Sequence, residues 1–134
     1  MKKTTLLLAG TSLALGATSA FAGSHTGSIT AVSWGGAYTV SQVEAYHKPW
    51  TAATGNTVVS EDYSGGIAEV KAQVEAGNVT WDIIDVEKSD AVRGCDEGLF
   101  MEIDPTSLPN GSDGSSAVED FIPGSFTDCA VANI

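Results

Sequence analysis

Extended apolar runs alternate with helical patterns along the chain, and this alternation constrains the fold more than any other feature. Three runs rich in β-branched and aromatic residues predict strands: SITAVSW (28–34), NTVVSEDY (56–63) and WDIIDV (81–86). Apolar residues at helical spacing predict helices between these strands and after the third. This order is typical of an α/β fold with a parallel sheet and right-handed crossovers.

The helix after the first strand carries conflicting signals. Two overlapping capping boxes, in which a hydroxyl residue precedes an amide or acid by three positions, begin at Thr39 and at Ser41. Gly55 predicts the end of this helix. Pro49 lies inside it and has no backbone N–H. We therefore expect Pro49 either to kink the helix near His47 or to restart it as a first-turn proline.

Two shorter helices follow. Ile67, Val70 and Val74 mark one face of a helix that ends at Gly77. A second helix is predicted over 91–97, after the third strand. Both lengths suit the helices of a small α/β unit.

The end of the chain is less regular. The helix over 91–97 has a candidate N-cap at Ser89 or Asp90 and a C-terminal stop at Gly98. The segment 103–121 is dense in Pro, Gly, Ser and Asn, which predicts a long surface loop. The final run, CAVANI (129–134), is typical of a strand. We find no internal repeat.

The N-terminus has the features of a secretory signal peptide. Lys2 and Lys3 precede an apolar stretch over 6–17, and Ala20-Phe21-Ala22 is a small-x-small cleavage pattern. The apolar stretch is short for a membrane span. We predict export with cleavage after residue 22, so that 1–22 is a signal peptide; an uncleaved anchor is the alternative.

The charge balance excludes one class of partner. Removal of Lys2 and Lys3 leaves four basic residues against seventeen acidic ones, a net charge of about −13 on the mature part. Such a surface repels phosphate backbones, so nucleic acid is not expected as a partner. The charge favours cationic ligands, although solubility alone would also account for it.

Two cysteines, Cys95 and Cys129, lie in the exported part. In an oxidising compartment one pair has a single possible connectivity, so we predict a structural Cys95–Cys129 disulfide. The chain-entropy estimate for a loop of this length is about 3–4 kcal/mol of stabilisation. No Cys/His cluster with metal-ligand spacing is present in the sequence, and no metal or cofactor is predicted.

Three segments should meet at the carboxyl edge of the parallel sheet, where ligands bind in open α/β folds. They are the residues that follow each strand: 34–36, 62–66 and 85–88. The glycines allow close approach of backbone, and the aromatic and acidic side chains offer binding groups. The candidate ligand-binding residues are Trp34, Gly35, Tyr38, Ser64, Gly65, Asp85 and Glu87. The alternative for the two aromatic residues is a tight turn with both rings in the core.

Signatures of known enzyme classes are missing from this sequence. It has no G-x-S-x-G elbow, no H-E-x-x-H and no G-x-x-x-x-G-K-[ST]. His47 lies on a predicted helix beside the core face, where a packed histidine is favoured over a catalytic one. We therefore predict that the protein is not an enzyme; an exported hydrolase is the weakest alternative.

Four runs of the sequence resemble the extracellular solute-binding proteins of ABC importers, most closely the spermidine/putrescine type. The runs are ITAVSWGGAY (29–38), KPWTAATGNTV (48–58), WDIIDVEKSDAVRGCDEGLFMEID (81–104) and DFIPGSFTDCAVANI (120–134). The resemblance implies a periplasmic-binding-protein-like (type II) α/β fold. It implies that 23–134 is the first part of an N-terminal lobe, truncated before the second lobe.

The resemblance also implies a function and a site. The protein would be a periplasmic, monomeric binding component that captures putrescine or spermidine and delivers it to a membrane permease. Trp34, Tyr38, Ser64 and the loop from Asp85 to Glu87 would line the cleft. The alternative is a related binder of ferric iron or another small solute, with Ser64-Gly65-Gly66 holding an anion.

Overall fold

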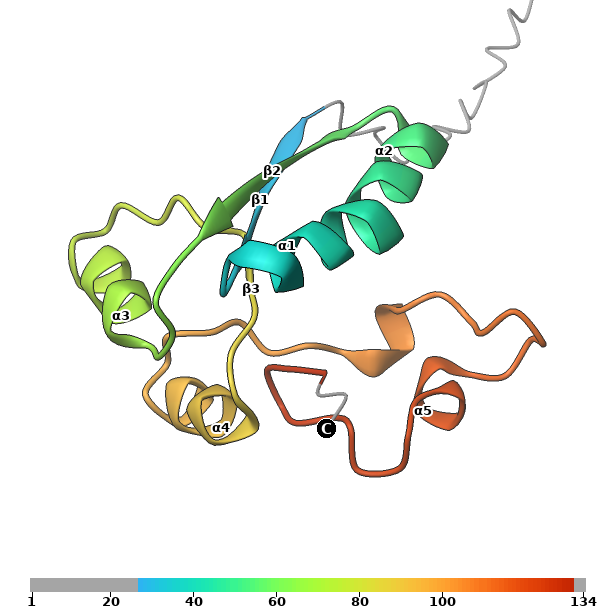
Figure 1. The fold of residues 1–134 in the computed structure, drawn as a ribbon. Coiled ribbons are helices and arrows are strands. Elements are labelled where there is room, and N and C mark those ends of the chain that lie inside the picture. Colours follow the sequence, from blue (N-terminus) through green and yellow to red (C-terminus); the bar gives the residue numbers. More distant parts are fainter. Residues whose placement is uncertain (1–26, 132–134) are drawn as a thin grey trace, which may run out of the picture.

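The computed structural model describes residues 27–131, and the predicted signal peptide lies outside these described residues. A three-stranded sheet in the order β2-β1-β3 forms the centre of the fold (Figure 1). Its strands are β1 (Ser28–Ser33), β2 (Thr57–Asp62) and β3 (Ile83–Ile84). Both neighbours pair with β1 in parallel, as the alternating strand and helix pattern predicts.

The pairing register aligns the carboxyl ends of the strands. β1 pairs with β2 along its whole length, from Ser28 opposite Thr57 to Ser33 opposite Asp62. β3 is much shorter than the predicted strand over 81–86. On both sides of β3 single backbone bonds to β1 remain, from the Asp82 N–H to the Thr30 carbonyl and from the Asp85 N–H to the Val32 carbonyl. The Thr30 N–H instead donates to the Asp82 carboxylate at 2.8 Å.

One continuous helical stretch follows β1 and lies along one side of β1 and β2 (Figure 1). It consists of α1 (Gly36–Gln42), a π-helical segment η1 (Val43–His47) and α2 (Lys48–Thr54), and it ends at Gly55 as predicted. The predicted capping boxes at Thr39 and Ser41 are wrong, because the helix has already begun at Gly36.

The π-helical segment accommodates Pro49. In η1 the Lys48 N–H donates to the Val43 carbonyl, five residues earlier. Pro49 then lies in the first turn of α2, directly after the wider π-helical turn. The structure thus combines the two predicted effects, a disturbed helix near His47 and a restart at the proline.

Two further helices lie below the carboxyl edge of the sheet in Figure 1: α3 (Ala68–Glu75) and α4 (Lys88–Asp96). The N-cap of α4 is Glu87, in an extended conformation, so the predicted N-caps Ser89 and Asp90 are wrong. Both residues lie inside the helix instead. None of the described helices is long and apolar enough to cross a membrane.

The predicted long loop contains two single-turn elements, η2 (Pro105–Ser107) and α5 (Ala117–Asp120). Of the predicted strand over 129–134, only 129–131 is described. Val131 forms an isolated antiparallel bridge with Phe126 rather than a strand. The predicted Cys95–Cys129 disulfide is confirmed, with 5.7 Å between the Cα atoms, and it ties this segment to α4.

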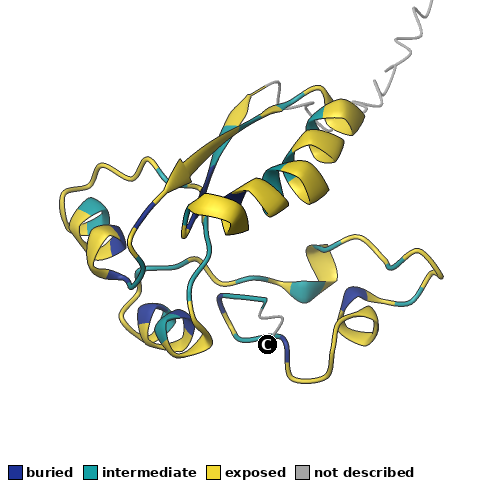
Figure 2. Ribbon diagram, in the orientation of Figure 1, coloured by how far each residue is buried: buried dark blue, intermediate teal, exposed yellow. Residues whose placement is uncertain are grey.

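The buried residues are few, and they lie in β1 and the segments near its carboxyl end, in α4, and in the C-terminal part of the described chain (Figure 2). Ala31, Val32 and Ser33 of β1 are buried, as are Ile67 and Val70 at the start of α3. Several large apolar side chains elsewhere remain exposed, among them Tyr46, Val59, Ile83 and Met101. Most of the buried residues therefore lie in the central strand and in the segments near its carboxyl end.

Gly94 of α4 gives a testable consequence of this packing. A Cβ built at Gly94 would lie 2.3 Å from Cε2 of Phe100, so Gly94→Ala forces the phenyl ring to move. Overpacking costs about 1–3 kcal/mol, and the better helix propensity of alanine returns about 1 kcal/mol. We expect a net destabilisation of about 1 kcal/mol in urea unfolding. With Phe100→Leu as the background, the same substitution should be neutral or stabilising; an equal loss in both backgrounds would contradict this account.

Candidate functional site

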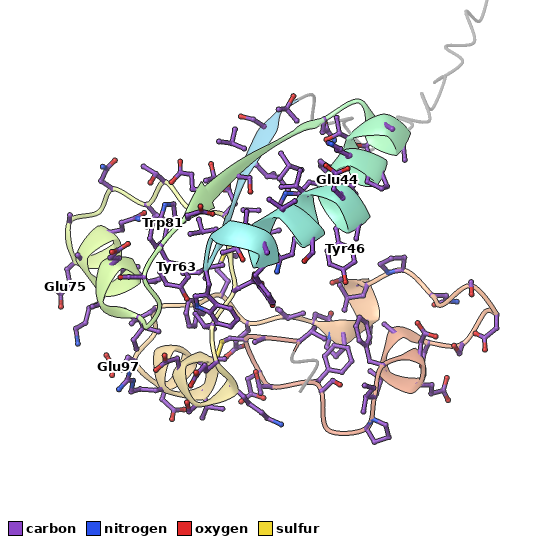
Figure 3. All side chains as sticks on the ribbon, viewed as in Figure 1. Glu44, Tyr46, Tyr63, Glu75, Trp81 and Glu97 are labelled. Atoms are coloured by element: carbon purple, nitrogen blue, oxygen red, sulfur yellow. A yellow bond between two sulfur atoms is a disulfide. The ribbon has the colours of Figure 1, made fainter. Side chains whose placement is uncertain are left out.

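A cleft of about 550 Å³ opens at the carboxyl edge of the sheet. It lies where the three segments that follow the strands meet, as the sequence predicts for an open parallel sheet. Figure 3 labels Tyr63, one of its lining residues, where β2 leads toward α3. The cleft is lined by Trp34, Tyr63, Ser64, Gly65, Gly66, Glu87 and Asp90.

Trp34 and Tyr38 form an aromatic pair of which Trp34 lines the cleft. Their ring centroids are 5.2 Å apart, with the planes tilted by 44°. Trp34 is 39% exposed and Tyr38 is 44% exposed, so neither ring is a core side chain in the described structure. Trp34 lines the cleft, whereas Tyr38 packs beside it and does not line it. An exposed indole beside a cleft can stack on an alkyl chain or on a cation.

The Ser64-Gly65-Gly66 turn forms another wall of the cleft. Gly65 and Gly66 have φ values of 95° and 80°, which favour glycine. A Cβ at Gly65 would lie 3.6 Å from Nε1 of Trp34, so the turn passes close to the indole. The turn leads into α3, whose N-cap residue makes no side-chain capping bond. Successive N–H groups at such a helix start can hold an anion.

Two carboxylates from the start of α4 line the opposite side. Glu87 is the N-cap of α4 and Asp90 is its third residue, so a three-residue spacing places both on one helix face. The sequence-based set contained Glu87 but not Asp90. The helical spacing could have identified Asp90, had α4 been predicted to begin at Lys88.

Asp85 was predicted to bind ligand, but its side chain has another partner. Its carboxylate accepts a hydrogen bond from Nε2 of Gln42 at 2.5 Å, and it does not line the cleft. Its backbone carbonyl accepts the hydroxyl of Tyr63. Gly35 is also outside the lining; its N–H donates to Oγ1 of Thr39. In this structure both residues support the cleft walls rather than form them.

Tyr63 is the residue of the cleft that sequence reasoning missed most clearly. It is 8% exposed, and its ring makes an edge contact with Trp81 at 5.7 Å between centroids. Burial raises the pKa of the Tyr63 hydroxyl above its ordinary value, and the negative charges of Asp85 and Asp90 add to this effect. The hydroxyl therefore stays protonated and keeps its hydrogen bond at physiological pH.

Among residues 27–131, no group of three or more His, Cys, Asp or Glu side chains could hold a metal ion. His47 is half-buried in η1, and its Nδ1 has no hydrogen-bond partner within this described part. His47 is not among the residues that line the cleft.

The sequence matches a bacterial extracellular solute-binding protein family over residues 45–131. The gamma-aminobutyric acid-binding protein of Pseudomonas aeruginosa is 42% identical over 105 residues, which cover 78% of this chain and 28% of that relative.

Solved structures agree with this match. The PBP MotA from A. tumefaciens B6 in complex with glucopine is 32% identical, with a TM-score of 0.64 over 75% of this chain and 28% of its own. An ABC transporter substrate-binding protein from Bradyrhizobium japonicum USDA 110 is 27% identical, with a TM-score of 0.68 over 78% of this chain and 30% of its own. The PBP AgtB from A. tumefaciens R10 in complex with agropinic acid is 34% identical, with a TM-score of 0.58 over 63% of this chain and 26% of its own.

These matches confirm the predicted fold class, a periplasmic-binding-protein-like α/β lobe with a parallel sheet. The chain spans less than a third of the length of each of these relatives.

Proposed function

The chain belongs to the bacterial extracellular solute-binding protein family, and on that premise we propose that it contributes part of one lobe to the binding component of an ABC importer. The component works in the periplasm after export, as a monomer that delivers solute to a membrane permease. It binds its solute without converting it. The observation that carries this proposal is the cleft at the carboxyl edge of the sheet, with an aromatic wall, a glycine turn and two carboxylates.

The bound solute carries an ammonium group. An ammonium over the face of Trp34 gains about 0.5–2 kcal/mol, and more where water is excluded. Glu87 and Asp90 line the same cleft and provide negative charge for the amine. Asp90 shares its charge with Arg93, whose Nη2 donates to its Oδ1 at 2.7 Å, so Glu87 is the main partner of the amine. The acidic chain adds a field that draws cations toward the site.

A carboxylate on the same solute suits the glycine turn. The N–H groups of Ser64-Gly65-Gly66 and of the start of α3 favour an anion, and a polyamine would leave them without one. The named ligand of the Pseudomonas aeruginosa relative, gamma-aminobutyric acid, carries an amine and a carboxylate. We therefore favour an amino-acid-like solute over putrescine or spermidine. The observation that favours a polyamine is the presence of two carboxylates in the lining, Glu87 and Asp90, one for each of two ammonium groups.

Calorimetric titration of the full-length mature protein with gamma-aminobutyric acid, putrescine and spermidine tests this proposal. We expect stoichiometric binding of an amine without turnover, weakened about ten-fold or more by Glu87→Gln because a charge-assisted contact is lost. Glu102→Gln, which lies away from the cleft, is the matched control and should bind as the unmodified protein does. Tight binding of putrescine alone would select the polyamine. Conversion of a solute, or no binding of any amine, would contradict the proposal.

A further inference from the structure

The turn between β1 and α1 carries Trp34, and the side chains of Thr39 and Asp62 form hydrogen bonds next to this turn. Thr39 of α1 is 8% exposed, and its Oγ1 accepts the Gly35 N–H at 2.8 Å. The same hydroxyl donates to Oδ1 of Asp62, the last residue of β2, also at 2.8 Å. A chain of hydrogen bonds thus joins the end of β2 to the peptide group that immediately follows Trp34.

The direction of this chain is fixed by chemistry. An ionised carboxylate only accepts hydrogen bonds, and a hydroxyl has a single proton to give. The Thr39 proton therefore points at Asp62, and a lone pair of its oxygen faces the Gly35 N–H. Because a carboxylate acceptor strengthens such a bond, the hydroxyl is held in one orientation.

Close packing restricts the same peptide group further. Gly35 has φ 82° and ψ −179°, a conformation that is essentially open to glycine alone. A Cβ at Gly35 would lie 3.1 Å from Oδ2 of Asp62, so the carboxylate packs directly against the glycine Cα. The orientation of the peptide between Trp34 and Gly35 is thus set by hydrogen bonding and by contact.

Trp34 also has contacts on its ring: the indole pairs with the ring of Tyr38 and lies near the Gly65 turn and the Tyr63 hydroxyl. Its ring is 39% exposed, and the ring beside it, that of Tyr38, is 44% exposed. These contacts leave part of the ring open to solvent, so the backbone that carries Trp34 contributes to the order of the indole.

We propose that Thr39 and Asp62 are positioning residues, which hold the indole of Trp34 in place along the cleft before a solute arrives. Such preorganisation reduces the entropy that binding would otherwise cost. The consequence for affinity rests on the proposed function, whereas the consequence for the mobility of Trp34 does not. The two can therefore be tested separately.

The mobility test uses the full-length protein with Trp34 as its single tryptophan. Trp50 in α2 and Trp81 just before β3 are replaced by Phe, as is any tryptophan outside residues 1–134. Time-resolved fluorescence anisotropy without solute then reports the motion of Trp34. Thr39→Val keeps the shape but removes the hydroxyl, and we expect a larger fast component of the anisotropy decay. Thr39→Ser keeps the hydroxyl and should leave the decay unchanged.

Two further variants make the test specific. Ser41→Ala removes an exposed hydroxyl from the same helix, one that donates to the Tyr38 carbonyl at 2.7 Å, and should not alter the decay. Asp62→Leu removes the acceptor and should mobilise Trp34 as Thr39→Val does, which covers the case in which one variant folds poorly. An unchanged decay in both folded variants would overturn the proposal.

Affinity measured on the same variants of the full-length protein, with gamma-aminobutyric acid and putrescine as probes, completes the experiment. Thr39→Val should weaken binding about ten-fold, and Thr39→Ser should not. Increased mobility with unchanged affinity would support the positioning role and contradict the assignment of Trp34 as a wall of the binding site. Unchanged mobility with weakened affinity would contradict the positioning role, and it would leave Trp34 as a wall of the binding site.

Discussion

Replacing both half-cystines, as in Cys95→Ala with Cys129→Ala, should lower the free energy of unfolding of the oxidised protein by about 3–4 kcal/mol. The disulfide spans 34 residues, so its loss restores considerable freedom to the unfolded chain. The loop that it closes contains only short elements, η2 and α5, and cannot recover this stability by its own packing. Urea unfolding followed by tryptophan fluorescence measures the change.

Reduction supplies the control for the disulfide. Dithiothreitol should lower the unfolding midpoint of the unmodified protein to that of the double variant, and should leave the variant itself unchanged. Cys129 is 9% exposed and Cys95 is half-buried, so alanine at these positions creates little new strain. Equal midpoints for the oxidised protein and the variant would show that the bridge does not stabilise the fold.

The sheet and its helices could be predicted because the pattern that specifies them is local. Runs of β-branched residues predict strands, and apolar residues at a period of 3.6 predict helices; both signals come from residues that are close together in the sequence. The helix starts were predicted less well, because Thr39 has the right residue type for a cap but is used in a tertiary contact with Asp62. The sequence does not distinguish these two uses of a hydroxyl.

The candidate site was predicted to the level of loops but not of side chains. Register places Ser33 opposite Asp62, and Asp85 follows β3 on the other side of β1. Both carboxylates then meet side chains of α1, Asp62 through Thr39 and Asp85 through Gln42. Since register depends on the pairing of separate strands, the sequence alone did not reveal that Asp85 would bond to α1.

Trp34→Ala should weaken solute binding by about 1–3 kcal/mol, or roughly 5- to 150-fold in affinity. The ring offers a face for an ammonium group and for the methylenes beside it, and alanine offers neither. Calorimetric titration of the full-length protein with gamma-aminobutyric acid, putrescine and spermidine measures the loss. A loss for every amine would point to the shared ammonium, and a loss confined to one solute would point to its alkyl chain.

Trp50→Ala is the matched control for this prediction. Trp50 is 38% exposed, almost the same as Trp34 at 39%, but it lies in α2 and does not line the cleft. Its replacement removes a similar ring and should leave affinity unchanged. A core tryptophan would cost about 3–5 kcal/mol of stability when truncated to alanine. Because Trp34 is exposed, the melting temperature of the solute-free Trp34→Ala protein should fall far less than such a cavity would require. Unchanged affinity together with a large fall in melting temperature would instead make Trp34 a structural residue.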